Sequence, residues 1–212
     1  MTYLTILLVI LGMLWISYGY FSVNQIEKPK YTLVSKNSTY EIRAYHAHLI
    51  ASVEIKDTYD SAATRGFRQI ANYIFGNNHN NSKIAMTAPV IQEQSQQIAM
   101  TAPVIQEKTD LNTYRISFVM PSEYTIETIA SPKNKQVTLK EISARKIAVR
   151  TFSGIFSVEK AQKELNVLKS SLQKDDIDAT GKVSISRYNP PATPPFMNRH
   201  EIWIELVENS NL

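Results

Sequence analysis

The hydrophobic and polar positions of the chain divide it into an apolar N-terminal run and a longer region of mixed polarity. Leu4 to Val23 carries no charged residue and is apolar or aromatic apart from Thr5, Ser17 and Ser22. About twenty such residues are enough to cross a bilayer as a helix. The run is apolar on all sides, which is unusual for a helix in the core of a small soluble domain. The pattern therefore predicts a single membrane-spanning helix within residues 1–24.

Two alternatives concern the processing and the orientation of this segment. Aromatic residues gather at its C-terminal end, as they do at membrane interfaces, and no lysine or arginine precedes the run. Both features favour an uncleaved anchor, although Ser17 and Gly19 are small enough to stand before the cleavage site of a signal peptide. Lys28 and Lys30 follow the run and favour a cytoplasmic domain, whereas the free N-terminal amine favours an exported one. Both orientations stay open.

After a short polar linker at residues 25–30, two segments have the apolar spacing of amphipathic helices. The first is Asp57 to Phe75, with Asp57 as a plausible N-cap, and the second begins at a Ser157 cap and runs to about Gln173. We expect both helices to pack on a sheet through apolar stripes, which comprise Ala63, Phe67, Ile70 and Ile74 in the first and Ala161, Leu165, Leu168 and Leu172 in the second.

Segments rich in β-formers, several with alternating polarity, surround each helix and predict strands. They are Tyr31 to Val34, Thr39 to Tyr45, Leu49 to Ile55, Thr113 to Met120, Gln136 to Ile142, Lys146 to Phe152, Gly181 to Tyr188 and Ile202 to Val207. The order of strands, helix and strands thus occurs twice. It predicts an α+β fold of two similar halves.

The decapeptide IAMTAPVIQE occurs twice, at Ile84 to Glu93 and at Ile98 to Glu107. Each copy contains a proline, which cannot donate to a sheet ladder, so the copies belong at sheet edges, bulges or bends. The simplest interpretation is a pair of extended segments joined by a turn. Each copy carries a methionine, Met86 or Met100, which fills the core or lines a cleft for a flat apolar ligand.

Composition excludes several functions. The net charge of +4 and the pI of about 9.1 are mildly basic, but no cluster of cations forms a nucleic-acid footprint, so we expect no nucleic-acid partner. The chain has no cysteine. Disulfides, thiolate catalysis, iron–sulfur clusters and covalent or thiolate-ligated heme are therefore excluded.

Catalytic signatures such as G-x-S-x-G, H-E-x-x-H, the P-loop and G-x-G-x-x-G are absent from the sequence. His46 and His48 are two residues apart and would share one face of a strand. Such a pair can bind a metal ion or offer an axial nitrogen to heme iron, or it can be two surface histidines near a turn.

Several short motifs, in order, resemble the SOUL family of heme-binding proteins. The motif KIAMTAPV at the first repeat is similar to the family signature, and the doubled form is similar to bacterial members. The resemblance covers roughly Tyr31 to Val207 and is also carried by YEIR at 40–43, GF at 66–67, YIFG at 73–76, SFVMP at 117–121, FSG at 152–154, YNPP at 188–191 and EIW at 201–203.

The resemblance implies a distorted antiparallel β-barrel of two pseudo-repeated halves with two flanking helices, occupying residues 31–212. It also implies a non-covalent heme or tetrapyrrole ligand and a binding or carrier role without catalysis. At the position of the family's proposed heme histidine this chain has Ala44, so His46 is the nearest substitute as axial ligand. Where the family has Arg-Arg-Asn-Glu, this chain reads Asn-Arg-His-Glu, which leaves Arg199 to meet a heme propionate.

The expected ligand site therefore comprises His46, His48, Met86, Met100 and Arg199. Its surface would be shared by the repeat, the end of the Ala44 strand and the loop from Pro190 to Arg199. Two other functions stay open at this point. One is a binding module for another apolar small molecule, by analogy with effector-binding domains, and the other is an enzyme acting on such a ligand.

Overall fold

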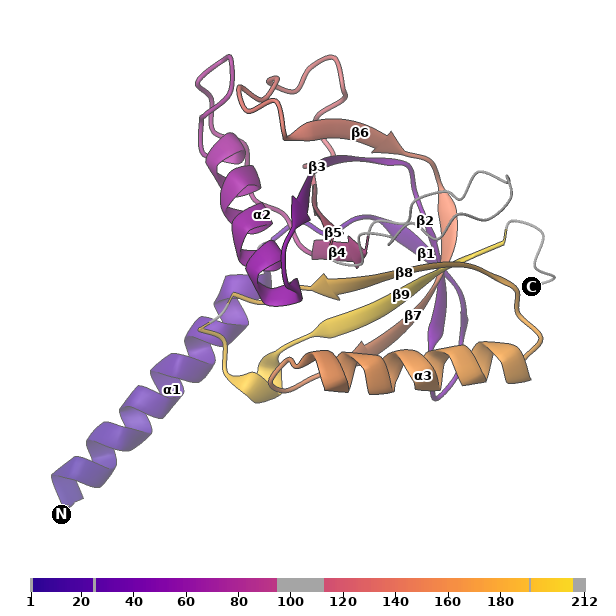
Figure 1. The fold of residues 1–212 in the computed structure, drawn as a ribbon. Coiled ribbons are helices and arrows are strands. Elements are labelled where there is room, and N and C mark those ends of the chain that lie inside the picture. Colours follow the sequence, from indigo (N-terminus) through magenta and orange to yellow (C-terminus); the bar gives the residue numbers. More distant parts are fainter. Residues whose placement is uncertain (1, 25, 95–112, 191, 208–212) are drawn as a thin grey trace, which may run out of the picture. The chain divides into compact units, whose positions relative to one another are not determined.

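The computed structural model describes residues 2–24, 26–94, 113–190 and 192–207 (Figure 1). The chain divides into two compact units. The first contains Met1–Ala47, Thr87–Pro89 and Ser143–Leu212, and the second contains His48–Met86 and Val90–Ile142.

The first unit is an antiparallel sheet with one helix packed on it and a long helix at its N-terminus. Its sheet has the order β1-β2-β7-β9-β8, and α3 packs against β7 and β9 (Figure 1). The elements are α1 (Thr2–Asn24), β1 (Tyr31–Lys36), β2 (Glu41–Tyr45), β7 (Arg145–Phe152), α3 (Val158–Lys174), β8 (Ala179–Arg187), the 3-10 turn η1 (Pro195–Met197) and β9 (His200–Leu206).

Alternation along the strands gives this sheet two different faces. Ile42 of β2 and Ile202 and Ile204 of β9 belong to an apolar cluster with Leu168 and Leu172 of α3. The residues between them in sequence turn to the opposite face, and several of those are polar. The predicted Ser157 cap is confirmed, because the Ser157 hydroxyl accepts a hydrogen bond from the Lys160 backbone N–H at 3.1 Å.

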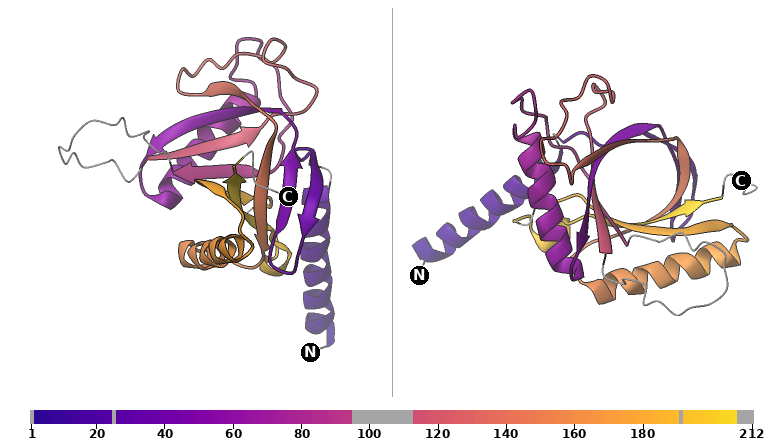
Figure 2. Two further views of the ribbon diagram at one scale, coloured as in Figure 1. Left: turned by 90° about the vertical axis from the view of Figure 1, so that its right-hand side faces the viewer. Right: turned by 45° about the horizontal axis from the view of Figure 1, so that its top comes forward.

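The second unit repeats the plan with a four-stranded antiparallel sheet in the order β4-β5-β3-β6. Its helix α2 packs against β5 and β3, and the right-hand view of Figure 2 shows it running across their sheet. The elements are β3 (His48–Lys56), α2 (Tyr59–Ile74), β4 (Val90–Gln94), β5 (Thr113–Val119) and β6 (Thr138–Ile142).

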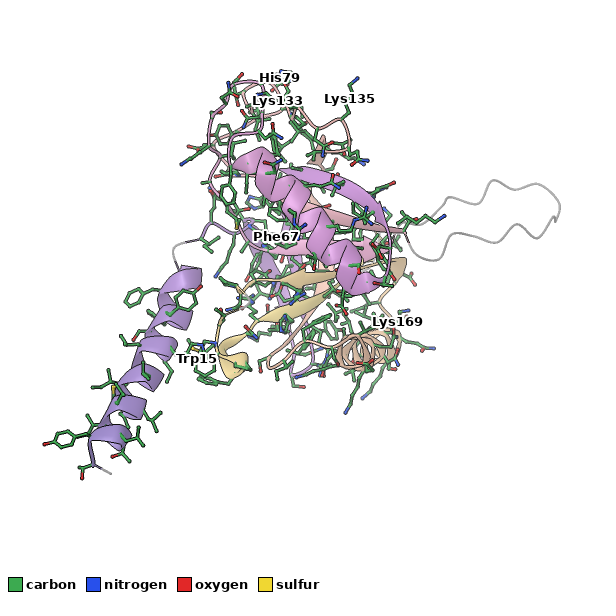
Figure 3. The ribbon with its side chains drawn as sticks, turned by 60° about the vertical axis from the view of Figure 1, so that its left-hand side comes forward. Trp15, Phe67, His79, Lys133, Lys135 and Lys169 are labelled. Carbon is green, nitrogen blue, oxygen red and sulfur yellow. The ribbon has the colours of Figure 1, made fainter. Side chains whose placement is uncertain are left out.

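In the first half of α2 the buried stripe is shifted by one position from the predicted stripe. Ala62, Gly66 and Ile70 are buried, whereas Phe67 is 41% exposed and is visible on the helix in Figure 3. A Cβ atom at Gly66 would lie 2.7 Å from the Ile116 side chain. The glycine therefore lets α2 approach β5 closely, and the bulky Phe67 is turned to the edge of the contact. The predicted cap is also wrong by one residue, since Thr58 is the N-cap.

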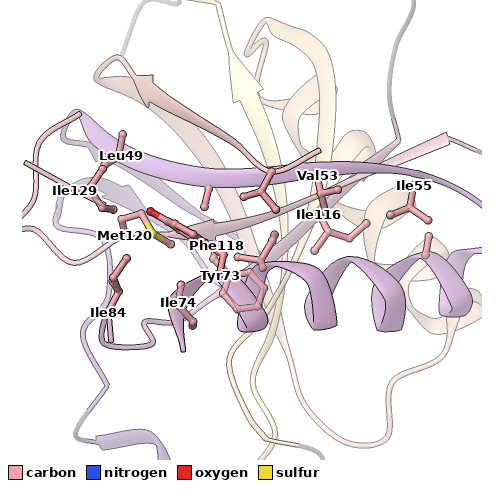
Figure 4. Close-up of a cluster of buried hydrophobic side chains, with 14 residues drawn as sticks. Leu49, Val53, Ile55, Tyr73, Ile74, Ile84, Ile116, Phe118, Met120 and Ile129 are labelled. Carbon is pink, nitrogen blue, oxygen red and sulfur yellow. The ribbon is translucent and has the colours of Figure 1, made fainter. Parts of the chain in front are cut away.

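Ile70, Ile74 and Tyr73 of α2 pack with strand residues in one cluster of buried side chains (Figure 4). Met86 of the first repeat copy packs against this cluster and is partly buried. The first copy becomes strand only from Val90 onward. The second copy, with Met100, lies outside the described residues, so the predicted hairpin stays a prediction.

The predicted α+β class is confirmed. Each unit is an antiparallel sheet with one helix packed on it, as the doubled order of strands and helix in the sequence predicts. The N-terminal helix α1 is also confirmed, and its span Thr2–Phe21 is long and apolar enough to cross a membrane.

Candidate functional site

A fully buried carboxylate, Glu201 on β9, is the centre of the polar face of the first unit. Glu201 is 0% exposed. In the sequence it follows His200 and precedes Ile202, which faces the apolar cluster under α3. An isolated buried carboxylate would be very unfavourable. Its neighbours must therefore compensate the negative charge.

Five side chains donate hydrogen bonds to Glu201, the longest of them from the Thr151 hydroxyl to Oε1 at 3.4 Å. Arg43 Nη1 and Arg199 Nη2 lie 3.0 and 2.6 Å from Oε1, and Arg199 Nε is a second donor to the same atom at 3.0 Å. Tyr188 OH and Trp203 Nε1 lie 2.6 and 2.7 Å from Oε2. Both carboxylate oxygens are thus saturated, which is the condition under which a buried charge is tolerated.

Arg43 is held in place by more than its ion pair. It is 2% exposed, and it donates to Tyr45 OH at 3.1 Å and to Glu41 Oε2 through Nε at 2.8 Å. Its guanidinium also lies 4.6 Å from the centre of the Tyr31 ring. The Tyr45 ring is tilted against Trp203 with centroids 4.8 Å apart, so aromatic and ionic contacts form one connected group.

This network determines which groups are charged. Burial opposes ionisation of Glu201, but Arg43 and Arg199 hold the pKa of its carboxyl below its usual value. Burial and the nearby Glu201 charge raise the pKa values of Tyr45 and Tyr188 well above the ordinary tyrosine value. At physiological pH Glu201 is therefore a carboxylate and both tyrosines are neutral, with Tyr188 donating to Glu201 and Tyr45 accepting from Arg43.

A third cation lies near the network. Partial burial, with Arg199 nearby, lowers the pKa of the Lys28 ammonium, and the charge of Glu201 partly offsets that shift. Lys28, Arg43 and Arg199 are thus three cations near two carboxylates, Glu201 and Glu41. The arrangement holds these side chains rigidly and leaves an excess of positive charge around Glu201. It is poorly suited to proton transfer, because Glu201 stays ionised and is sealed from solvent.

His200 is a separate buried group on the α3 side of β9. Its Nε2 donates to the Gly154 carbonyl at 3.1 Å, and its ring lies 5.2 and 5.5 Å from the Phe152 and Phe156 ring centres. Burial lowers the pKa of the imidazole, against the Gly154 hydrogen bond, so the ring is neutral at physiological pH. The ring is therefore part of the packing between β9 and the Gly154 turn.

The predicted site residues lie in different parts of the chain. His46 and Arg199 belong to the first unit, His48 and Met86 belong to the second, and Met100 is outside the described residues. His46 is exposed, directly after β2, and its backbone N–H donates to the Lys30 carbonyl at 3.1 Å. Arg199 is bound to Glu201 while 37% of its side chain stays exposed.

The buried network was not predicted from the sequence, although its residues belong to three of the motifs quoted above. Arg43 ends YEIR, Tyr188 begins YNPP, and Glu201 and Trp203 belong to EIW. A sequence signal was available, because Glu201 shares one face of the closing strand with the bulky apolar Trp203, although Glu205 follows on the same face. Charged residues are almost never fully buried without a partner, so this pattern indicates a buried ion pair.

Comparisons with known proteins agree with this arrangement of motifs. The family model described as SOUL heme-binding protein matches residues 26–205. Heme-binding protein 2 of Homo sapiens is 32% identical over 170 residues, which cover 78% of this chain and 77% of that protein. Heme-binding protein 2 of Mus musculus is 28% identical over 172 residues, with the same coverage.

Solved structures with similar folds have very different sequences. The EcmrR C-terminal domain matches with a TM-score of 0.56 at 10% identity, covering 84% of this chain and 98% of that one. A hydrolase from Listeria innocua matches with a TM-score of 0.53 at 9% identity, covering 82% and 94%. At such identities the likeness concerns the fold alone.

Proposed function

Because the chain belongs to the SOUL family, we propose that it binds heme or a closely related tetrapyrrole non-covalently. The observation that carries the proposal is the family match over residues 26–205, together with 32% identity to a heme-binding protein. The chain lacks cysteine, which restricts heme attachment to non-covalent contacts and excludes a thiolate axial ligand.

Residues of the described units suit the chemistry that heme requires. His46 is exposed on a backbone fixed by its bond to Lys30, so its imidazole is the proposed axial ligand in place of Ala44. Arg199 keeps 37% of its side chain exposed beside an excess of positive charge, which suits a propionate carboxylate. We further propose His48, Met86 and Met100 as heme-binding residues, on the sequence reasoning alone. When bound, heme would supply the iron and the absorption spectrum by which binding is measured.

We propose a binding or carrier role rather than catalysis. Glu201 is the group with the most elaborate environment, yet its neighbours keep it ionised and bury it completely. A general acid or base must reach the substrate and exchange a proton near the working pH. Glu201 satisfies neither condition in this environment.

We also propose that α1 tethers the domain to a membrane, with 1–24 as the anchor, 25–30 as the linker and 31–212 as the binding domain. Support comes from the exposure of the apolar side chains of α1, for example 60% at Leu8 and 63% at Phe21. The other support is Gly19, which is buried against Pro194 and Met197. A signal peptidase would have to reach the chain beside this contact, so the packing favours an uncleaved anchor.

Titration of the purified full-length chain in detergent with micromolar hemin, followed by Soret absorbance, tests the heme proposal. We expect saturable binding, a shifted Soret band for His46→Ala and an unchanged band for His79→Ala, since His79 is an exposed loop histidine. Absence of a saturable spectral change in the unmodified chain would overturn heme binding. If His46→Ala leaves the spectrum unchanged, the axial assignment alone is wrong.

A further inference from the structure

The loop around η1 packs against the C-terminal half of α1. Trp15 Nε1 donates to the Ala192 carbonyl at 2.8 Å, and Figure 3 shows Trp15 beside the η1 segment. One turn further along the helix, a Cβ at Gly19 would lie 2.8 Å from Pro194 Cδ and 3.0 Å from Met197 Sδ. The loop therefore runs directly beside residues 15–19 of the helix.

The length of α1 determines how deep that contact lies in a membrane. A hydrocarbon core of about 30 Å needs roughly 20 helical residues at about 1.5 Å each. The apolar span Thr2–Phe21 has 20 residues, so it has no length to spare. Trp15 and Gly19 then fall within its last two turns. A loop that contacts both of them must reach from the bilayer interface into the edge of the hydrocarbon core and cannot lie in bulk water.

The composition of the loop suits that depth. Pro190, Pro191, Pro194 and Pro195 have no backbone N–H, so the loop contains few donors that would need water. The Ala192 carbonyl is satisfied by Trp15, and the Pro195 carbonyl accepts from the Gly154 N–H at 3.0 Å.

Two large apolar side chains project from this region. Phe196 in η1 is 66% exposed, and Ile155, in the turn that Gly154 bonds to Pro195, is 74% exposed. We call Ile155 and Phe196 the apolar tip. Two cations contact residues that lie beside Ile155 in the same turn: Arg187 is 4.8 Å from the Phe156 ring centre, and Lys160 donates to the Ser153 carbonyl. An apolar projection beside cations is the usual composition of a membrane-interface contact.

We propose that the apolar tip inserts into the interfacial layer of the same phospholipid bilayer that holds α1, so that the first unit rests on the membrane surface. This inference rests on the proposed tether and is independent of heme binding. The tip and α1 are then two contacts with one bilayer, and the hydrogen bond between Trp15 and Ala192 connects them. The first unit is consequently held at the surface in a defined orientation.

The absence of cysteine makes single-site labelling straightforward. We would prepare Ile155→Cys and Phe196→Cys in the full-length chain, with Lys169→Cys on the exposed face of α3 as the matched control in the same unit. Each variant is labelled with the environment-sensitive fluorophore NBD and reconstituted into vesicles containing phosphatidylglycerol. Emission maximum and quenching by aqueous iodide are measured after flotation of the vesicles.

We expect blue-shifted emission and several-fold weaker iodide quenching at 155 and 196 than at 169. If the chain floats with the vesicles but iodide quenches all three positions equally, the inference is overturned and the tether stands. If the chain does not float with the vesicles, both the membrane contact of the apolar tip and the tether are overturned. Hemin titration of the same samples decides heme binding separately.

Discussion

Arg43 Nη1 and Glu201 Oε1 lie 3.0 Å apart in an ion pair whose side chains are 2% and 0% exposed. The two residues are separated by 158 positions in the sequence. The pair joins β2 to β9 across β7, which lies between them in the sheet. It is thus a contact that only the folded first unit can form.

We expect Arg43→Met to lower the free energy of unfolding by about 3–5 kcal/mol, because it leaves a buried carboxylate with one cation fewer. The measurement is urea unfolding of the full-length chain in detergent. The control is Arg115→Met, which removes an ion pair to Glu54 whose side chains are 43% and 53% exposed. That change should lower the free energy of unfolding by at most about 1 kcal/mol. Equal effects of the two substitutions would contradict the assigned role of the buried pair.

Acid should destabilise the protein through Glu201. Its pKa is lowered on folding, so its contribution to stability is complete above the ordinary value of 4.5 and is lost as pH falls through the lower folded-state pKa. In Glu201→Gln this contribution is absent at every pH. Urea unfolding at a series of pH values should therefore show a steeper loss below about pH 4.5 in the unmodified chain than in the variant. Parallel curves would show that Glu201 is not the group that titrates.

Gly66 should not tolerate alanine, although alanine is the better helix former by about 1 kcal/mol. The added Cβ would meet Ile116 at 2.7 Å, and overpacking of this kind costs about 1–3 kcal/mol. We expect Gly66→Ala to lower the midpoint of urea unfolding. Combining it with Ile116→Gly should cost less than the sum of the two single changes, because this change removes both Cβ and Cγ1 of Ile116, the atoms nearest the added methyl group. Strict additivity would mean that the two residues do not compete for space.

Core substitutions on α2 should distinguish the observed stripe from the one that periodicity predicts. Ile70 is 0% exposed and Phe67 is 41% exposed. We expect Ile70→Ala to cost about 2–5 kcal/mol in unfolding free energy, as is usual for a buried isoleucine. Phe67→Ala should cost less, because only part of its ring is buried against Phe118 at a centroid distance of 5.3 Å. A cost of Phe67→Ala as large as that of Ile70→Ala would favour the predicted stripe, in which both residues are buried.

The anchor predicts a simple fractionation result. The full-length chain should remain with membranes after alkaline carbonate washing, and its intact mass should match all 212 residues. Deletion of residues 1–28 should release the protein into the soluble fraction. Recovery of a soluble protein at full mass would contradict the tether. A mass that begins at Tyr20 would show that the segment is a cleaved signal peptide.

The sequence by itself determined the features that depend on local periodicity or composition. The apolar run of α1, the Ser157 cap and the α+β order can be predicted because a helix start, a strand pattern or a membrane span is encoded within a few turns of chain. The family resemblance was equally available, because its motifs are short and contiguous. The same reasoning indicated His46 and Arg199 as candidate ligand residues, which remain proposals.

Only the tertiary structure decided which side chains work together. It showed that Arg199 binds Glu201, that Gly66 rather than Phe67 is buried against Ile116 of β5, and that Trp15 contacts the loop at Ala192. The physical reason is that burial, pKa and close packing depend on neighbours that are distant in sequence, and periodicity within one segment contains no information about them. A charge at position 201 is visible in the sequence, but Arg43, which keeps it ionised, is adjacent only after β2 and β9 have joined the same sheet.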